Sequence, residues 1–236
     1  MEAHTLTDEQ KHLVTGFTDA VKKLKLLKED SVSRNARLLD IRYRLTLDLR
    51  ISIETEYSST KTKDVHDVYE LLFKFLDLWN VYEVCCAYGK KLGVCTKDKV
   101  SGWKDSFLKE AGILSFLERQ ADAFRQNMVS ASSYSEKYRQ YLVHFSELDA
   151  VKDSNKKQYQ KYLEAYAEEF DYKQLLFIQY MERNSYYHGG EAAKAGSDYK
   201  YRQKQLLFFI DFLTEFIAVL GSALFEKESN DFKGVS

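Results

Sequence analysis

The absence of proline is the feature that most restricts what this chain can fold into. The 236 residues contain no Pro and 10 Gly, whereas an average sequence of this length carries roughly 12 Pro and 16 Gly. Sandwiches, barrels and linker-rich chains need the fixed φ of Pro or the positive φ of Gly in their many turns. We therefore expect an all-α protein.

Composition and charge further restrict the kinds of protein that this chain can be. Hydrophobic residues make up 44% of the chain, which is enough for one sizeable core, and we expect a single domain over residues 1–236. The formal net charge is −1, so the surface as a whole is not that of a basic, sequence-independent binder of nucleic acid. Local basic patches are still allowed.

Targeting segments and cysteines indicate the compartment. The first ten residues, MEAHTLTDEQ, contain no apolar segment of the signal-peptide type. The most apolar stretch, residues 206–225, carries Asp211 and Glu215 near its middle, and two carboxylates there disfavour a membrane span. We expect a cytoplasmic protein with no membrane partner, no metal and no cofactor. Three cysteines match neither a disulfide framework nor a zinc site, and we expect them to be reduced core thiols: Cys85, Cys86 and Cys95.

Apolar residues that recur every three or four positions predict seven helices. The expected ranges are about 8–29, 32–57, 64–88, 103–128, 133–149, 151–189 with an exposed connection up to 160, and 197–225, before a polar tail at 227–236. Capping-box patterns precede the first and fifth helices at Thr7 with Gln10 and at Ser133 with Glu136. Gly89 is expected to stop the third helix.

Residues 43–57 are ambiguous between helix and strand. Apolar residues alternate strictly with polar ones there, which normally indicates a strand: Tyr43, Leu45, Leu47, Leu49, Ile51 and Ile53. No other part of the chain alternates comparably, and a lone strand leaves its backbone groups unpaired unless another chain supplies a partner. We favour a long helix buried on two sides, with a strand or hairpin as the alternative.

The string with the clearest chemical content is ERNSYYHGG, residues 182–190. An imidazole can take the proton of a ribose 2′-OH or return one to the leaving 5′-oxygen, and a guanidinium can stabilise phosphate charge. Arg183 and His188 lie about 140° apart on a regular helix, but Gly189 and Gly190 permit the helix to end at His188. Asn184 could orient the imidazole or donate to phosphate. Arg183, Asn184 and His188 thus have the chemistry that a metal-independent catalytic site would need.

This string resembles the Arg-x(4–6)-His motif of the HEPN superfamily, with Asn after the Arg and Gly after the His. The resemblance covers about the last third of the chain, from Asp171 through the closing helix, within a motif-bearing C-terminal part of about 153–226. It implies a catalytic site of Arg183, Asn184 and His188 and an up-and-down helical bundle, in this chain with extra N-terminal helices. It further implies an endoribonuclease of toxin–antitoxin or antiviral defence systems, with an antitoxin or regulatory protein as a possible partner. Some HEPN toxins carry a modified Tyr two residues after the His, where this chain has Gly190.

Other interpretations of the motif are open. Arg183 could pair with a carboxylate and His188 could cap a helix C-terminus, where a cation is favoured. A second match, Arg139 with His144, lacks the Asn and the Gly, and we interpret His144 as an ordinary helix histidine. The alternative function is a non-catalytic helical module that binds nucleotide or protein.

Two further features concern partners. Basic and aromatic residues follow the motif, as in surfaces that bind RNA, although the start of any solvated helix can look the same: Lys194, Tyr199, Lys200, Arg202 and Lys204. Apolar side chains in residues 206–225 point around most of the helix circumference, so we expect another surface to cover them. A homodimer would do this, and in HEPN nucleases the two motifs face each other across a two-fold axis.

Overall fold

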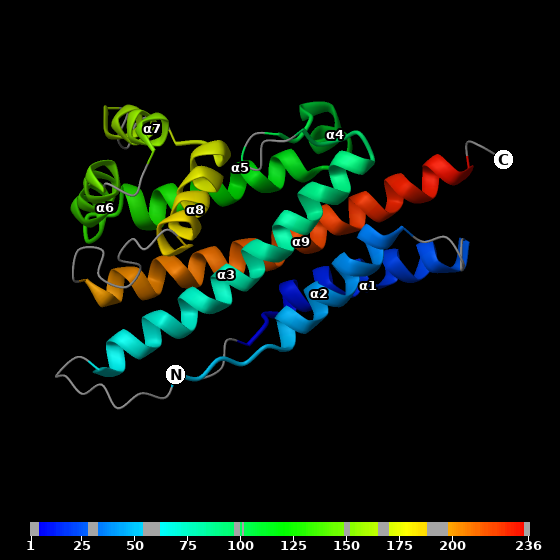
Figure 1. Ribbon diagram of the computed structural model, residues 1–236, viewed down its shortest axis with the longest axis horizontal. Helices are drawn as coiled ribbons and strands as arrows, with labels where there is room; N and C mark the ends of the chain where they lie inside the picture. Colours follow the sequence, from blue (N-terminus) through cyan, green and yellow to red (C-terminus); the bar gives the residue numbers. More distant parts are fainter. Residues whose placement is uncertain are drawn as a thin grey trace. The chain divides into compact units, whose positions relative to one another are not determined.

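The computed structural model describes residues 5–27, 33–53, 62–96, 100, 102–148, 152–164, 170–187 and 198–233. Of these residues 84% are helical, and no strand occurs among them. The all-α helical bundle expected from the lack of proline is confirmed, and Figure 1 shows the order of its helices. Whether the bundle is of the HEPN type stays a prediction.

Helices of very different length succeed one another along the described chain. In chain order they are α1 (Asp8–Leu27), α2 (Arg34–Asp48), α3 (Thr62–Lys91), α4 (Asp105–Glu110), α5 (Ile113–Phe124), the π-helical turn η1 (Arg125–Val129), α6 (Ser135–Glu147), α7 (Asp153–Glu164), α8 (Tyr172–Tyr187) and α9 (Tyr199–Lys233).

The chain divides into two compact units, and each is described by itself. Unit 1 contains Met1–Ile51, Lys74–Ser115 and Ile210–Ser236, and unit 2 contains Ser52–Phe73 and Phe116–Phe209. Both units are discontinuous in sequence, because α3 and α9 contribute residues to each. The region around the predicted motif, 153–226, is therefore shared between the units at residue 210. The expectation of a single domain stays a prediction.

Unit 1 is organised around the second part of α9. Phe17 of α1 packs edge-on against Tyr43 of α2 and Phe225 of α9, with ring centroids 4.8 and 5.1 Å apart. Gly221 makes this approach possible, because a Cβ at that position would lie 2.5 Å from the Phe17 ring. Tyr43 also donates from its hydroxyl to the Thr214 carbonyl at 2.6 Å.

The predicted start of α1 is confirmed. The backbone N–H of Thr7 donates to Gln10 Oε1 at 3.0 Å, and that of Gln10 donates to Thr7 Oγ1 at 3.2 Å, which is the reciprocal capping box. The same Gln10 side chain donates to Asp211 Oδ1 at 2.8 Å and Glu215 Oε1 at 3.2 Å on α9. The cap thus also fixes α1 against α9.

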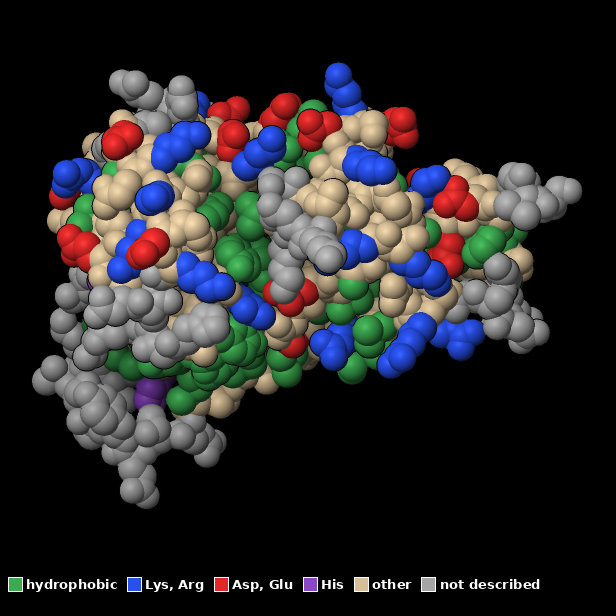
Figure 2. All heavy atoms as spheres, turned by 45° about the horizontal axis from the view of Figure 1, so that its top comes forward, with side chains coloured by type: hydrophobic (Ala, Val, Ile, Leu, Met, Phe, Trp, Pro, Cys, Tyr) green, Lys and Arg blue, Asp and Glu red, His purple; other side chains and the backbone are tan. Residues whose placement is uncertain are grey.

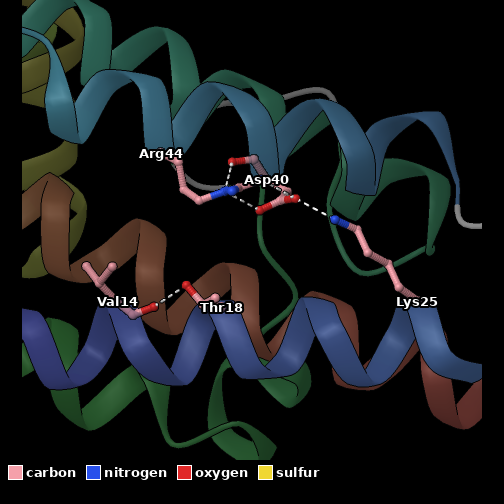
Figure 3. Close-up of polar contacts among 5 residues, drawn as sticks. All are labelled: Val14, Thr18, Lys25, Asp40 and Arg44. Atoms are coloured by element: carbon pink, nitrogen blue, oxygen red, sulfur yellow. Dashed lines mark hydrogen bonds and ion pairs between the residues drawn. The ribbon is translucent and has the colours of Figure 1, made fainter.

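A buried carboxylate joins α1 to α2. Asp40 is 2% exposed and accepts from Lys25 Nζ at 2.8 Å and from Arg44 Nε and Nη2 at 2.8 Å each. Figure 3 shows Lys25 and Arg44 converging on Asp40 from two helices, and Thr18 donating to the Val14 carbonyl along α1 at 2.9 Å. Two cations around one carboxylate offset the cost of burying it.

The segment from residue 32 to 57 differs from its prediction. It is helical, as we favoured, but only over Arg34–Asp48, with Ser33 as the N-cap. Residues 49–53 are neither helix nor strand, and 54–57 lie outside the described residues. Burial on two sides is wrong, because Leu45 is 66% exposed while Tyr43 is fully buried. One side of the helix packs inward, at Ala36, Leu39, Asp40, Tyr43 and Thr46.

Unit 2 has an aromatic core around the end of α5. Phe124 contacts the rings of Tyr138, Phe170, Phe208 and Phe209 at centroid distances of 6.1, 5.4, 5.1 and 5.7 Å. The helices α6 and α7 pack against each other, with Phe145 and Tyr159 stacked at 5.8 Å. Rings from α5, α6 and α9 thus enclose one core.

Several predicted helix boundaries are wrong. The helix expected over 103–128 breaks at Gly112, whose φ of +68° is not helical. Ser133 does not cap α6, because the N-cap is Tyr134 without a side-chain hydrogen bond. The helix expected over 151–189 is two helices, α7 and α8. Gly89 does not stop α3, which ends at Lys91. A Cβ at Gly89 would lie 2.5 Å from the Trp103 ring, so the glycine allows this ring to approach the helix closely.

The predicted polar tail, 227–236, continues α9 as far as Lys233, and residues 234–236 lie outside the described residues. The helix runs through Lys233, and Glu228 is only 5% exposed. Its carboxylate accepts from Ser33 Oγ at 3.1 Å and from the Tyr88 hydroxyl. A polar residue is part of the core at this position because two hydroxyl donors satisfy it.

The apolar length of α9 is covered within the chain. Over Tyr199–Phe232 this helix is long and apolar enough to cross a membrane, but core helices of soluble proteins pass the same test. Residues Phe209, Leu213 and Phe216 are fully buried. All the residues of α9 from 206 to 225 are buried or half-buried in the described structure, so their apolar character does not by itself indicate a dimer. On the face shown in Figure 2, acidic and basic side chains are interspersed, in keeping with the net charge of −1.

Candidate functional site

The motif sits at the C-terminal end of α8, in unit 2. The helix begins where the Asp171 carboxylate accepts from the backbone N–H of Gln174 at 2.8 Å, an N-cap. Its apolar residues are buried on more than one side: Leu175, Leu176, Phe177, Ile178 and Met181. α8 is therefore a core helix, and its last turn has a fixed position within the unit.

A buried ion pair holds this last turn to α9. Glu182 is fully buried and Arg202 is 1% exposed, and the guanidinium donates to both carboxylate oxygens. Tyr141 of α6 donates to Glu182 Oε2 at 2.7 Å, and Arg202 also donates to Gln205 Oε1. Burial disfavours the charge of Arg202, but the carboxylate beside it outweighs this and raises its pKa above the ordinary value.

Arg183, the next residue, is half-buried and is oriented by its own helix. Its Nη1 donates to Asn184 Oδ1 at 2.9 Å, and its guanidinium lies 4.5 Å from the centroid of the Tyr187 ring. Because the Asn184 oxygen accepts from Arg183, the amide nitrogen of Asn184 keeps its donors for another group. Two of the three predicted catalytic residues are thus side by side.

The third predicted catalytic residue is not described. α8 ends at Tyr187, which is 49% exposed, and His188, Gly189 and Gly190 lie outside the described residues, as does Lys194. The distance between Arg183 and His188 therefore stays a prediction.

The predicted RNA-contacting residues separate into two environments. Tyr199 is half-buried, and Lys200 and Lys204 are exposed on one side of the first turns of α9. Arg202 lies in the interior, bound to Glu182, so it is not part of a solvent-facing basic surface.

A basic and aromatic cluster combines the predicted Lys200 and Lys204 with two residues that sequence reasoning missed, Tyr134 and Lys137. Lys204 and Lys137 approach the ring of Tyr134 from 4.8 and 5.5 Å, and we call Tyr134, Lys137, Lys200 and Lys204 the lysine cluster. Lys137 is also ion-paired with Asp198. Burial opposes ionisation of Asp198, but Lys137 and the backbone N–H of Tyr201 outweigh it and keep its pKa low. The missed residues, Tyr134 as the N-cap and Lys137 in the first turn, lie at the start of α6, which is far from the motif in sequence.

The second sequence match has a different setting. Arg139 on α6 is 54% exposed in its side chain and lies 3.9 Å from Glu136, an ordinary surface pair. His144 is half-buried, with its ring edge-on to Phe145 at 5.5 Å. No ring orients Arg139 as Tyr187 orients Arg183 in the described part of unit 2, and α6 continues past His144 to Glu147.

The other candidate groups are structural. Cys85, Cys86 and Cys95 are buried and form no disulfide. Burial raises the pKa of the Cys85 thiol, which makes it a poor nucleophile. Within the described ranges, no group of three or more His, Cys, Asp or Glu side chains could hold a metal ion.

Comparisons of the chain with protein-family models, with curated proteins and with solved structures found no match.

Proposed function

We propose that the protein is a metal-independent endoribonuclease of the HEPN type, with Arg183 as the phosphate-binding residue and His188 as the proton-transfer residue. The observation that carries the proposal is the orientation of Arg183 by Asn184 and Tyr187 at the last turn of α8. The buried ion pair between Glu182 and Arg202 also supports the proposal, because it holds the last turn of α8 in place next to Arg183. A preoriented guanidinium stabilises charge without reorganising during the reaction.

The reaction would proceed by attack within the RNA. His188 takes the proton of a ribose 2′-OH, the 2′-oxygen bonds to the adjacent phosphorus, and the bond from phosphorus to O5′ breaks. A proton then goes to O5′, which leaves as a hydroxyl, and the other product ends in a 2′,3′-cyclic phosphate. Arg183 binds the non-bridging oxygens, on which negative charge increases. DNA is not a substrate, because it has no 2′-OH.

The lysine cluster supports RNA as the substrate class. Lys200 and Lys204 are exposed, and the half-buried ring of Tyr134 lies beside Lys204 and Lys137. Lysines neutralise a phosphate backbone and aromatic rings stack on bases, which together bind single strands without strict sequence preference.

The test uses two matched pairs of variants on an end-labelled RNA oligonucleotide. Arg183→Ala and His188→Ala should each reduce cleavage by about 100-fold or more, because charge stabilisation and proton transfer contribute on that scale. Arg139→Ala and His144→Ala, from the second match, should change it little. Circular dichroism should show all four variants folded.

Further measurements identify the mechanism. Cleavage should continue in a chelator, and the products should carry cyclic or 3′-phosphate ends. Cleavage of DNA, dependence on a divalent metal, or equal losses in both variant pairs would contradict the proposal. Binding of RNA without cleavage would favour the alternative, a non-catalytic helical binding module.

A further inference from the structure

The outward side of α2 carries a line of exposed hydrophobic side chains. Leu38, Ile41 and Leu45 are 37, 52 and 66% exposed, and Leu49, just after the helix, is 41% exposed. Their spacing of three and four residues places them in one row along the helix. The opposite side of α2 is the packed one. We call these four residues the outer stripe.

Exposed arginines flank the outer stripe, and their side chains have no partner among the described residues. The side chains of Arg34, Arg37 and Arg42 are exposed, and none of them has a hydrogen bond or ion pair with another described residue. Helical geometry places Arg37 and Arg42 on opposite sides of the row. Arg44 differs, because Asp40 binds it (Figure 3). One exposed acid, Asp48, lies at the C-terminal end of the helix.

We propose that the outer stripe binds the surface of an anionic lipid bilayer. Leucine and isoleucine side chains would enter the boundary between headgroups and acyl chains, and the flanking arginines would contact lipid phosphates. This needs no spanning helix, so it is compatible with the carboxylates within α9, although it departs from the expectation of no membrane partner. It is independent of the proposed ribonuclease activity.

The charge and shape of the outer stripe favour a lipid bilayer over a second copy of the chain or an RNA as the binding partner. A second copy placed on the stripe would bring six exposed arginines, three from each chain, into one interface against one exposed acid of α2 from each chain. RNA phosphates could pair with the arginines, but binding of RNA would not explain the four exposed aliphatic side chains. The stripe is the convex edge of a helix, which a deformable bilayer accepts without a matching groove.

The apolar area of the outer stripe is small, so both the aliphatic side chains and the flanking arginines should be needed for binding to the bilayer. Single short apolar contacts give weak, reversible membrane binding unless basic residues add to them. We therefore expect the full chain to float with vesicles of phosphatidylcholine and phosphatidylglycerol, and not with phosphatidylcholine alone. Ile41→Ser with Leu45→Ser should weaken flotation about 10-fold, and Arg37→Ala with Arg42→Ala by about the same factor.

Control variants test whether loss of flotation is specific to the outer stripe and its flanking arginines. Arg119→Ala with Arg139→Ala removes two exposed arginines of α5 and α6 and should leave flotation unchanged, as should Tyr187→Ser. All substituted side chains are exposed, so thermal unfolding curves should match the wild type.

Several results would overturn the proposal. These are no flotation with either vesicle, equal flotation with both, unchanged flotation of the stripe variant, or a fall in mass of the lipid-free stripe variant from dimer to monomer. The last result would identify a second copy of the chain as the occupant. Loss of RNA binding in the arginine variant, with flotation intact, would identify nucleic acid.

Discussion

At the scale of single residues, Arg202 shows that the environment of a side chain can differ from what its neighbours in the sequence suggest. Its neighbours in sequence are basic and aromatic, yet it is 1% exposed and bound to Glu182. A lone buried charge is costly, and this one is tolerated because the carboxylate, Gln205 and the ring of Tyr141 surround it. Its role is to hold α8 to α9.

Removing one partner should therefore be more damaging than removing both. Arg202→Leu should lower the free energy of unfolding by about 3–5 kcal/mol, because it leaves the Glu182 carboxylate buried without its cation. The double variant Glu182→Leu with Arg202→Leu should recover part of that loss. Thermal unfolding followed by circular dichroism measures both, with exposed Arg139→Ala as the control. A single variant as stable as the control would mean that the pair does not hold unit 2 together.

At the scale of elements, α1 and α2 are positioned by a few specific contacts with α9. The Gln10 amide bridges to Asp211 and Glu215, and Phe17 packs at Gly221. Burial raises the pKa of Glu215, with Asp211 adding to the effect, while the hydrogen bond from Gln10 opposes it. At Gly221, α1 and α9 approach closely because α9 has no side chain there.

Gly221→Ala should destabilise unit 1, because the new Cβ would meet the Phe17 ring at 2.5 Å. Overpacking of this kind costs about 1–3 kcal/mol, partly offset by the better helix propensity of Ala. Gly16→Ala is the matched control in α1, since nothing lies within 4 Å of its Cβ position. It should stabilise by up to about 1 kcal/mol. If both substitutions change the melting temperature equally, close packing at Gly221 is not the cause.

At the scale of the whole molecule, the expected homodimer now depends on the HEPN resemblance alone. The apolar surplus of residues 206–225 is covered by the chain itself, as Leu213 and Phe216 show. In that superfamily two motifs face each other, so a dimer would bring two copies of Arg183 together with two of His188.

Light scattering at micromolar concentration should give a mass twice the chain's 27.6 kDa. The same mass should be found for the variant with Ser at Ile41 and Leu45, because the outer stripe is not the expected dimer surface. A monomeric wild type would remove the dimer and with it the expectation of a composite site.

Local information in the sequence was enough for the fold class and for several elements. The lack of proline predicted helices throughout, and Thr7 with Gln10 located the start of α1, because chain entropy and capping act within a few residues. Arg183 and Asn184 were predicted as members of one site, but the hydrogen bond between them was not predicted and is seen only in the structure. Only the tertiary structure decided which sides of the helices are buried. It placed Arg202 in the core, turned Leu45 outward and extended α9 past Glu228, because burial and ion pairing depend on side chains that are distant along the chain.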